Sequence, residues 1–170
     1  MEKTTLLLAE LEQEAQPTRQ LLERVPADRL AWRPHPKSMT LGQLAMHVAQ
    51  VPGAFADILT SDEVDFSTIE FGTPSPADAT DLLVMLNVSL SRARTLLAQL
   101  SEERAAALFH ARLADQQLFE LPRFTLVRSL TFNHWYHHRG QLSVYLRLLD
   151  VPLPPIYGPT ADENPFEPGV

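Results

Sequence analysis

The chain has 170 residues, of which 45% are hydrophobic and 21% charged, with a formal net charge of −7 and no cysteine. This length and balance predict a folded globular chain with one substantial core. The negative charge argues against a nucleic-acid partner and against an anionic membrane surface. Without cysteine there are no disulfides and no thiolate ligands or nucleophiles, so any metal must be held by nitrogen or oxygen.

No stretch of the sequence approaches the roughly 20 apolar residues of a membrane span. The N-terminal residues lack the basic start and continuous apolar run of a signal peptide. A cytoplasmic location is therefore expected.

The first half of the chain begins with a predicted helix and a connection. Apolar residues recur at helical spacing over 2–25, with a bend expected at Pro17. Residues 30–39 include two prolines and show no clear period, which is typical of a connection. Thr40 and Gln43 have the spacing of a capping box, so a second helix is predicted to open there.

The second predicted helix carries a histidine on its inward face. Pro52-Gly53 interrupts it, and a kink rather than an end is expected because the apolar spacing resumes afterwards. His47 falls on the inward stripe. That stripe consists of Leu44, Val48, Val51, Phe55, Ile58 and Leu59.

The middle of the chain predicts a loop, a long helix and a longer connection. Residues 60–75 are acidic and rich in turn formers. Ser75-Pro76-Ala77-Asp78 is a good helix start, and the third helix is expected to run to about Leu100. A short extra helix is predicted over 101–108, and residues 110–121 alternate weakly and could be extended.

The last predicted helix spans about 123–149, with Pro122 at its first turn. Prolines then exclude regular structure in a tail over 151–170. We therefore predict an all-α fold, a four-helix bundle with long crossover connections over 1–150. The inward stripe of the last helix is predicted to be Val127, Leu130, Thr131, His134, His138, Gln141, Tyr145 and Leu148.

The candidate site is the group His47, His134 and His138. His134 and His138 are four residues apart, so on a helix they lie one turn apart on the same face. Two imidazoles in that relation can share a metal ion if a third ligand comes from another segment, and His47 is predicted to point inward on another helix. Ordinary polar core residues fit the spacing equally well.

Other interpretations of the same stretch are less well supported. Trp135 stands where zinc proteases of the H-E-x-x-H type have glutamate, so that class is rejected. His137 is off the stripe, and a role as ligand or base would require a different helix rotation. His35 and His110 lie in predicted connections and have no assigned role.

The nearby hydroxyls Ser129, Thr131 and Ser143 lack the strained turn of a serine nucleophile and are interpreted as structural. Acidic runs are interpreted as solvated helix starts or loops.

These motifs resemble the DinB-like (DinB/YfiT) superfamily of metal-binding helical bundles over about residues 5–150. The resemblance rests on Trp32-Arg33-Pro34, on the run from Thr40 to His47, and on the run from His134 to Leu142, which contains H-x-x-x-H-R-G-Q.

The resemblance implies that His47, His134 and His138 bind a divalent ion, zinc or nickel most often, with open positions for water or substrate. It also implies a homodimer and a small-molecule substrate, in some relatives a low-molecular-weight thiol used by a thiol S-transferase. Hydrolysis by a metal-bound water, and a non-catalytic stress-related protein with a structural metal, are the alternatives. The roles of Tyr136, Arg139 and Gln141 stay open between substrate contact and helix packing.

Overall fold

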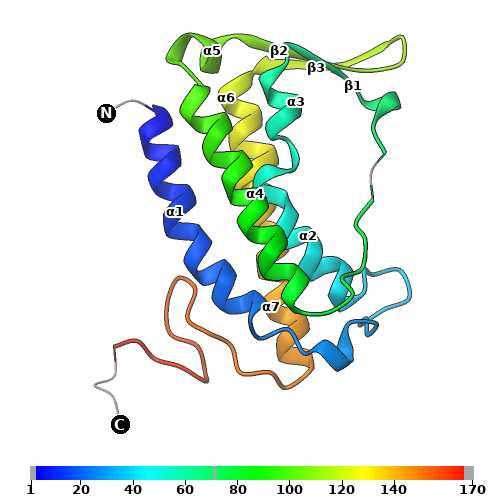
Figure 1. Cartoon of the computed structure of the whole chain (residues 1–170), viewed down its shortest axis with the longest axis vertical. Coiled ribbons are helices and arrows are strands. Elements are labelled where there is room, and N and C mark those ends of the chain that lie inside the picture. The colour runs from blue at the N-terminus through cyan, green and yellow to red at the C-terminus, as the bar shows by residue number, and fades with distance from the viewer. Residues whose placement is uncertain (1–2, 71, 167–170) are drawn as a thin grey trace.

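The computed structural model describes residues 3–70 and 72–166. Residue 2 of the first predicted helix and residues 167–170 of the predicted tail lie outside this range. Long helices run roughly along the long axis of the molecule (Figure 1). They are α1 (Lys3–Leu22), α2 (Leu41–Ala54), α4 (Thr80–Gln99) and α7 (His134–Leu148).

The all-α prediction is wrong, because a small mixed sheet lies at one end of the helices (Figure 1). Its strands are β1 (Glu63–Asp65), β2 (Leu108–Leu113) and β3 (Gln116–Pro122), in the order β1-β2-β3. β1 pairs with β2 in parallel, and β2 with β3 antiparallel. The fold is thus a helical bundle with a three-stranded sheet, and not a plain four-helix bundle.

The sheet arises inside segments that the sequence predicts as connections. The weak alternation over 110–121 indicates only part of it, and residues 60–75 are predicted to be a loop. Asp65 anchors β1, because its carboxylate accepts hydrogen bonds from the Arg112 guanidinium at 2.7 Å and from the backbone N–H of Ala114 at 3.0 Å. Ala114 occupies the turn with a φ of 51°, a conformation that is uncommon for alanine.

A fully buried arginine joins the sheet end to the helices. Arg123 begins α6 (Arg123–Leu126), and its guanidinium donates to the backbone carbonyls of Leu59, Ser61 and Arg104 and to the Asp62 carboxylate. These groups lie at the ends of α3 (Ala56–Thr60) and α5 (Glu102–Ala106), where helical carbonyls lack partners within the helix. The short helix α5 confirms the prediction of an extra helix there, with the Ser101 hydroxyl accepting from the Arg104 N–H.

The second helix starts as predicted and is interrupted near the predicted place. Thr40 and Gln43 form both hydrogen bonds of the capping box. After Ala54, Phe55 leaves the helical conformation for one residue and α3 continues. Gly53 lies against α4, and its N–H donates to the Ser89 hydroxyl at 2.8 Å.

Gly53 and Gly140 make a matched pair for testing this close approach. A Cβ at Gly53 would meet the Ser89 carbonyl oxygen at 2.5 Å, whereas at Gly140 nothing lies within 4 Å. We expect Gly53→Ala to lower the free energy of unfolding by about 1–3 kcal/mol through overpacking. We expect Gly140→Ala, in the interior of α7, to raise it by about 0.5–1 kcal/mol. Urea denaturation of both variants checks this, and equal effects would contradict the packing of α2 on α4.

The last helix is not uniform. Between α6 and α7 lies the π-helical segment η3 (Val127–Asn133), whose wider turns shift the register of everything after it. The buried residues of α7 are consequently Trp135, Arg139, Leu142 and Leu146. The predicted stripe is therefore rotated, and two of its members, Gln141 and Leu148, are exposed.

The predicted tail makes specific contacts with α1 and α7. The Tyr157 hydroxyl lies between the Glu14 carboxylate and the Arg139 guanidinium, and the Arg24 guanidinium donates to the Pro152 carbonyl at 2.9 Å. In the described part of the chain, none of the helices combines the length and apolar character needed to cross a bilayer.

Candidate metal centre

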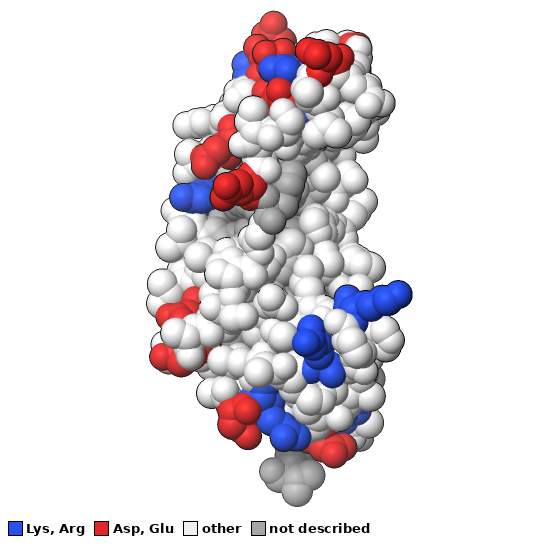
Figure 2. All heavy atoms as spheres, turned by 90° about the vertical axis from the view of Figure 1, so that its right-hand side faces the viewer, with Lys and Arg blue, Asp and Glu red and all other residues white. Residues whose placement is uncertain are grey.

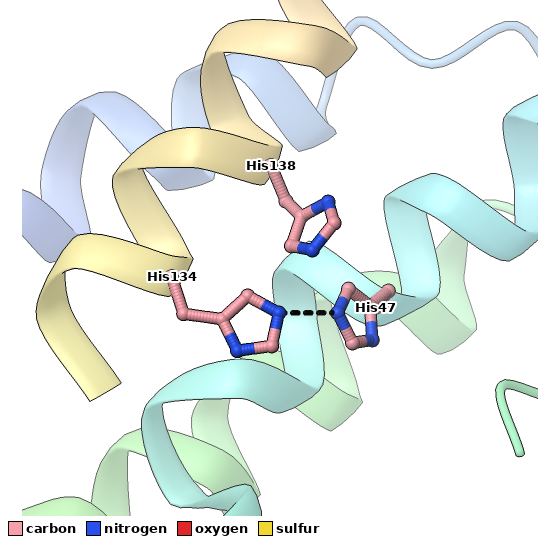
Figure 3. Close-up of side chains that lie close together, drawn as sticks. All are labelled: His47, His134 and His138. Carbon is pink, nitrogen blue, oxygen red and sulfur yellow. Dashed lines mark hydrogen bonds between the residues drawn. The ribbon is translucent and has the colours of Figure 1, made fainter. Parts of the chain in front are cut away.

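The three histidines selected from the sequence come together in space. His134 and His138 project from the last helix toward His47 on α2 (Figure 3). Their ring centroids lie 4.4 Å apart for His47–His138, 4.6 Å for His134–His138 and 5.1 Å for His47–His134. One ring nitrogen from each lies within 4.8 Å of the others, so the group could hold a metal ion.

The outer side of each ring is held by another group. The Thr73 hydroxyl lies 3.3 Å from His47 Nδ1, and the Gln141 Oε1 lies 2.8 Å from His138 Nδ1. His134 has a backbone hydrogen bond to Leu130. Because an amide oxygen only accepts, His138 Nδ1 carries the proton and Nε2 keeps its lone pair.

Burial keeps the three rings neutral. It is the main cause that lowers the pKa of His47 to about 4, with further contributions from His138 and His134. Burial also lowers the pKa values of His134 and His138. Neutral imidazole is the form that binds a metal, so these ligands need not lose a proton at neutral pH.

The spacing suits a shared cation. The Nε2 atoms of His47 and His134 are 3.2 Å apart. Two nitrogens bound at about 2.0–2.1 Å to one tetrahedral zinc ion are about 3.3 Å from each other. The group contains no carboxylate among the described residues, so the three imidazoles would leave at least one coordination position open.

Two cavities flank the cluster. His47 and His134 line one of about 520 Å³. His138 lines another of about 420 Å³, together with Leu44 and Tyr145. Met39 lines both. An open position would therefore be accessible to a small molecule.

The remaining candidate residues fall outside the cluster. His137 is exposed and its Nε2 accepts from the Gln141 amide at 3.1 Å. Tyr136 donates its hydroxyl proton to the Glu10 carboxylate at 2.6 Å, so it faces α1. Burial and this carboxylate raise the Tyr136 pKa above its ordinary value. Arg139 also faces α1, where it pairs with Glu14.

Other sequence candidates stay apart from the cluster. His110 Nδ1 lies 3.0 Å from the Glu120 carboxylate on the sheet, and His35 accepts a hydrogen bond from the Lys37 N–H. The Ser143 hydroxyl donates to the Gly140 carbonyl, which agrees with a structural role.

Sequence reasoning missed one group at the centre. Thr73 belongs to the connection between η2 (Phe66–Thr68) and α4, which passes along the right-hand side of the molecule in Figure 1. Only the tertiary fold brings this connection to His47, and a threonine in a turn-rich segment carries no signal of its own.

Gln141 offers a test of the outer hydrogen bonds. Gln141→Leu removes the acceptor of His138 Nδ1, and we expect zinc affinity to fall by about 10–100-fold, as for other residues that orient a metal ligand. Gln141→Glu retains an acceptor and is expected to lose less. Competition titration with a zinc chelator measures both, and an unchanged affinity in Gln141→Leu would contradict this role.

Comparison with known proteins gives a consistent assignment. A family model described as the DinB family matches residues 1–167. The uncharacterized protein YjoA of Bacillus subtilis (strain 168) is 24% identical over 136 residues, which cover 76% of this chain and 80% of YjoA.

Solved structures share the fold at low identity. The structure of the DinB-like protein YjoA from Bacillus subtilis has a TM-score of 0.69 and 22% identity, covering 89% of this chain and 97% of that one. A DinB-like protein from Bacillus cereus ATCC 10987 has a TM-score of 0.64 and 22% identity, covering 88% and 95%. A putative DinB family member from Exiguobacterium sibiricum 255-15 has 0.61 and 20%, covering 91% and 97%.

Proposed function

The chain belongs to the DinB family, and from this premise we propose that it is a metal-dependent enzyme that transfers a thiol sulfur to an electrophile. The observation that carries the proposal is a cluster of three converging imidazoles, without a carboxylate among the described residues, placed between two cavities. Catalytic metal sites keep an open position in this way, whereas structural sites are closed by a fourth protein ligand.

His47, His134 and His138 would hold the ion, zinc or nickel. A divalent ion there would bind a thiol sulfur and lower its pKa, so that the thiolate is available at neutral pH. The absence of cysteine in the chain is compatible, because the thiol would come from a cosubstrate. In the transfer, the thiol would lose its proton to solvent, sulfur would form a bond to an electrophilic carbon, and the leaving group would depart with the electron pair of its own bond.

The protein's own contribution would be to position the metal ligands and keep them in the neutral form. Thr73 and Gln141 fix two of the rings from outside, so that the inner nitrogens converge. Burial lowers the pKa of each of the three imidazoles, which favours the neutral form at neutral pH. Metal-assisted hydrolysis would need a general base; no carboxylate belongs to the imidazole group among the described residues, and the one that lines the larger cavity is the exposed Glu70.

The experiment is metal loading followed by a thiol-transfer assay. The purified protein is loaded with zinc or nickel and given 1-chloro-2,4-dinitrobenzene with bacillithiol, mycothiol, glutathione or cysteine. We expect metal-dependent product formation with at least one thiol, and its loss in His47→Ala while the melting temperature of the metal-free protein stays nearly unchanged. Collapse of the fold in His47→Ala would instead favour a structural metal, and a rate independent of metal would contradict the proposal.

A further inference from the structure

The larger of the two cavities, lined by His47 and His134, has many apolar residues in its lining. Half of its lining residues are apolar, where α2, α3 and the connection after η2 meet, and its polar lining residues are His47, His134, Gln50, Glu70 and Thr73. The apolar side chains are Met39, Val51, Ala54, Phe55, Ile58 and Ile69. The volume of about 520 Å³ falls in the range of small-molecule sites.

The only charge in the described lining of this cavity is negative. No lysine or arginine belongs to its described lining, and the one charged group there is the exposed Glu70. On the face shown in Figure 2, the central part is largely uncharged and charged side chains lie mainly toward the ends and edges. In the metal-free chain, an anionic ligand in the cavity would lose water without gaining a cationic side chain from the described lining, which is unfavourable.

One uncommitted polar group lies next to the histidines. Gln50 follows His47 by three residues, so the two share a face of α2. Gln50 lines this cavity and also the one between α2 and α4; its backbone carbonyl accepts from the Ser89 hydroxyl, and its side-chain amide has no hydrogen bond to another described residue. Thr73 also lines the cavity, and its hydroxyl contacts His47. The Gln50 amide is thus available to donate to, or accept from, one polar group of a ligand.

We propose that this cavity binds the electrophilic substrate, and that this substrate is an uncharged, largely apolar molecule with one hydrogen-bonding group. The proposal rests on the function proposed above, since it assigns the second reactant of that reaction. The apolar body of the substrate would pack against Phe55 and Ile58, and its polar group would face Gln50, beside the imidazole cluster.

A matched pair of probes tests the charge preference. 2-Naphthamide and 2-naphthoate have nearly the same shape and differ in charge. Isothermal titration calorimetry on the metal-free full chain is expected to show the amide binding at least about tenfold more tightly than the carboxylate. Equal affinities, or a preference for the carboxylate, would overturn the proposal.

Lysine substitutions in the lining test whether the probes bind in this cavity. Ile58→Lys introduces a cation into the wall and is expected to weaken amide binding at least about tenfold and to strengthen binding of the carboxylate. Ala54→Lys, at an exposed position of the same lining, is a second variant that should fold. The control is Val144→Lys, at an exposed position on the other cavity, which should change neither affinity.

If Val144→Lys weakens amide binding while Ala54→Lys and Ile58→Lys leave it unchanged, the ligand binds elsewhere and the proposal is overturned. Because binding is measured without metal, it does not depend on transfer activity. If the transfer assay fails but the probes bind with the expected preference, only the proposed reaction is rejected. If transfer activity is found but the probes bind without that preference, only the proposed substrate class is rejected.

Discussion

His134→Ala and His138→Ala are each expected to lower zinc affinity by more than about 100-fold, beyond the range seen when a residue that only orients a ligand is lost. Each variant removes one of the three imidazoles that converge in Figure 3. Two nitrogen ligands would remain, and a two-ligand site holds zinc far less tightly than a three-ligand site. Competition with a chelator measures the affinities.

His137→Ala is the matched control for these variants. His137 is on the same helix, is exposed and lies outside the cluster, although it accepts a hydrogen bond from Gln141. Its removal is expected to change zinc affinity by less than about tenfold. A loss in His137→Ala equal to that in His138→Ala would contradict the assignment of ligands.

Thermal unfolding gives an independent readout of the same variants. An ion that binds only the folded state stabilises it by RT ln(1 + [L]/Kd). Excess zinc should therefore raise the melting temperature of the unmodified chain and have little effect on His134→Ala. An equal rise in both proteins would show that zinc binds elsewhere.

Arg139→Met is expected to lower the free energy of unfolding by about 3–5 kcal/mol, the range for breaking a buried ion pair. The Arg139 and Glu14 side chains are 2% and 7% exposed, and the guanidinium also donates to the Thr18 hydroxyl at 3.0 Å. Without Arg139, the Glu14 carboxylate stays buried with only the Tyr157 hydroxyl as a donor among these groups. Urea denaturation measures the loss.

The double variant Glu14→Gln/Arg139→Met separates the ion pair from simple loss of packing. The amide introduced at position 14 is uncharged, so we expect the double variant to recover at least about 1 kcal/mol relative to Arg139→Met alone. Zinc affinity should be nearly unchanged in both, because Arg139 faces α1 and not the cluster. A more than tenfold loss of zinc affinity in a folded Arg139→Met would show that this residue acts at the metal centre.

The grouping of the three histidines could be predicted from the sequence, because local features place each of them on an inward helix face, although the spacing alone fits polar core residues equally well. A capping box fixes the start of α2 and hence the direction of His47, and the four-residue spacing of His134 and His138 survives because α7 begins at His134. The prediction that these three histidines are metal ligands depended on these local features and on the family resemblance.

The sheet and the buried face of α7 could not be predicted as well from the sequence. β1 is three residues long, and its Asp65 carboxylate accepts hydrogen bonds from the Arg112 side chain of β2 and from the Ala114 backbone N–H in the following turn, so its pairing is set by tertiary contacts. The rotation of α7 follows from the π-helical turns of η3, which the apolar spacing, interpreted with an α-helical period, does not reveal. Trp135 and Arg139 are buried for this reason, and the histidines lie at the edge of the buried face.

We propose that one ion binds the three imidazoles of His47, His134 and His138 and keeps an open coordination position. X-ray absorption spectroscopy of the zinc-loaded protein tests it most directly, because the spectrum counts imidazole ligands and gives their bond lengths. We expect three imidazole nitrogens at about 2.0–2.1 Å with at least one further oxygen ligand from solvent, and two imidazoles in His47→Ala. A spectrum with one imidazole or none, or one unchanged by His47→Ala, would contradict it.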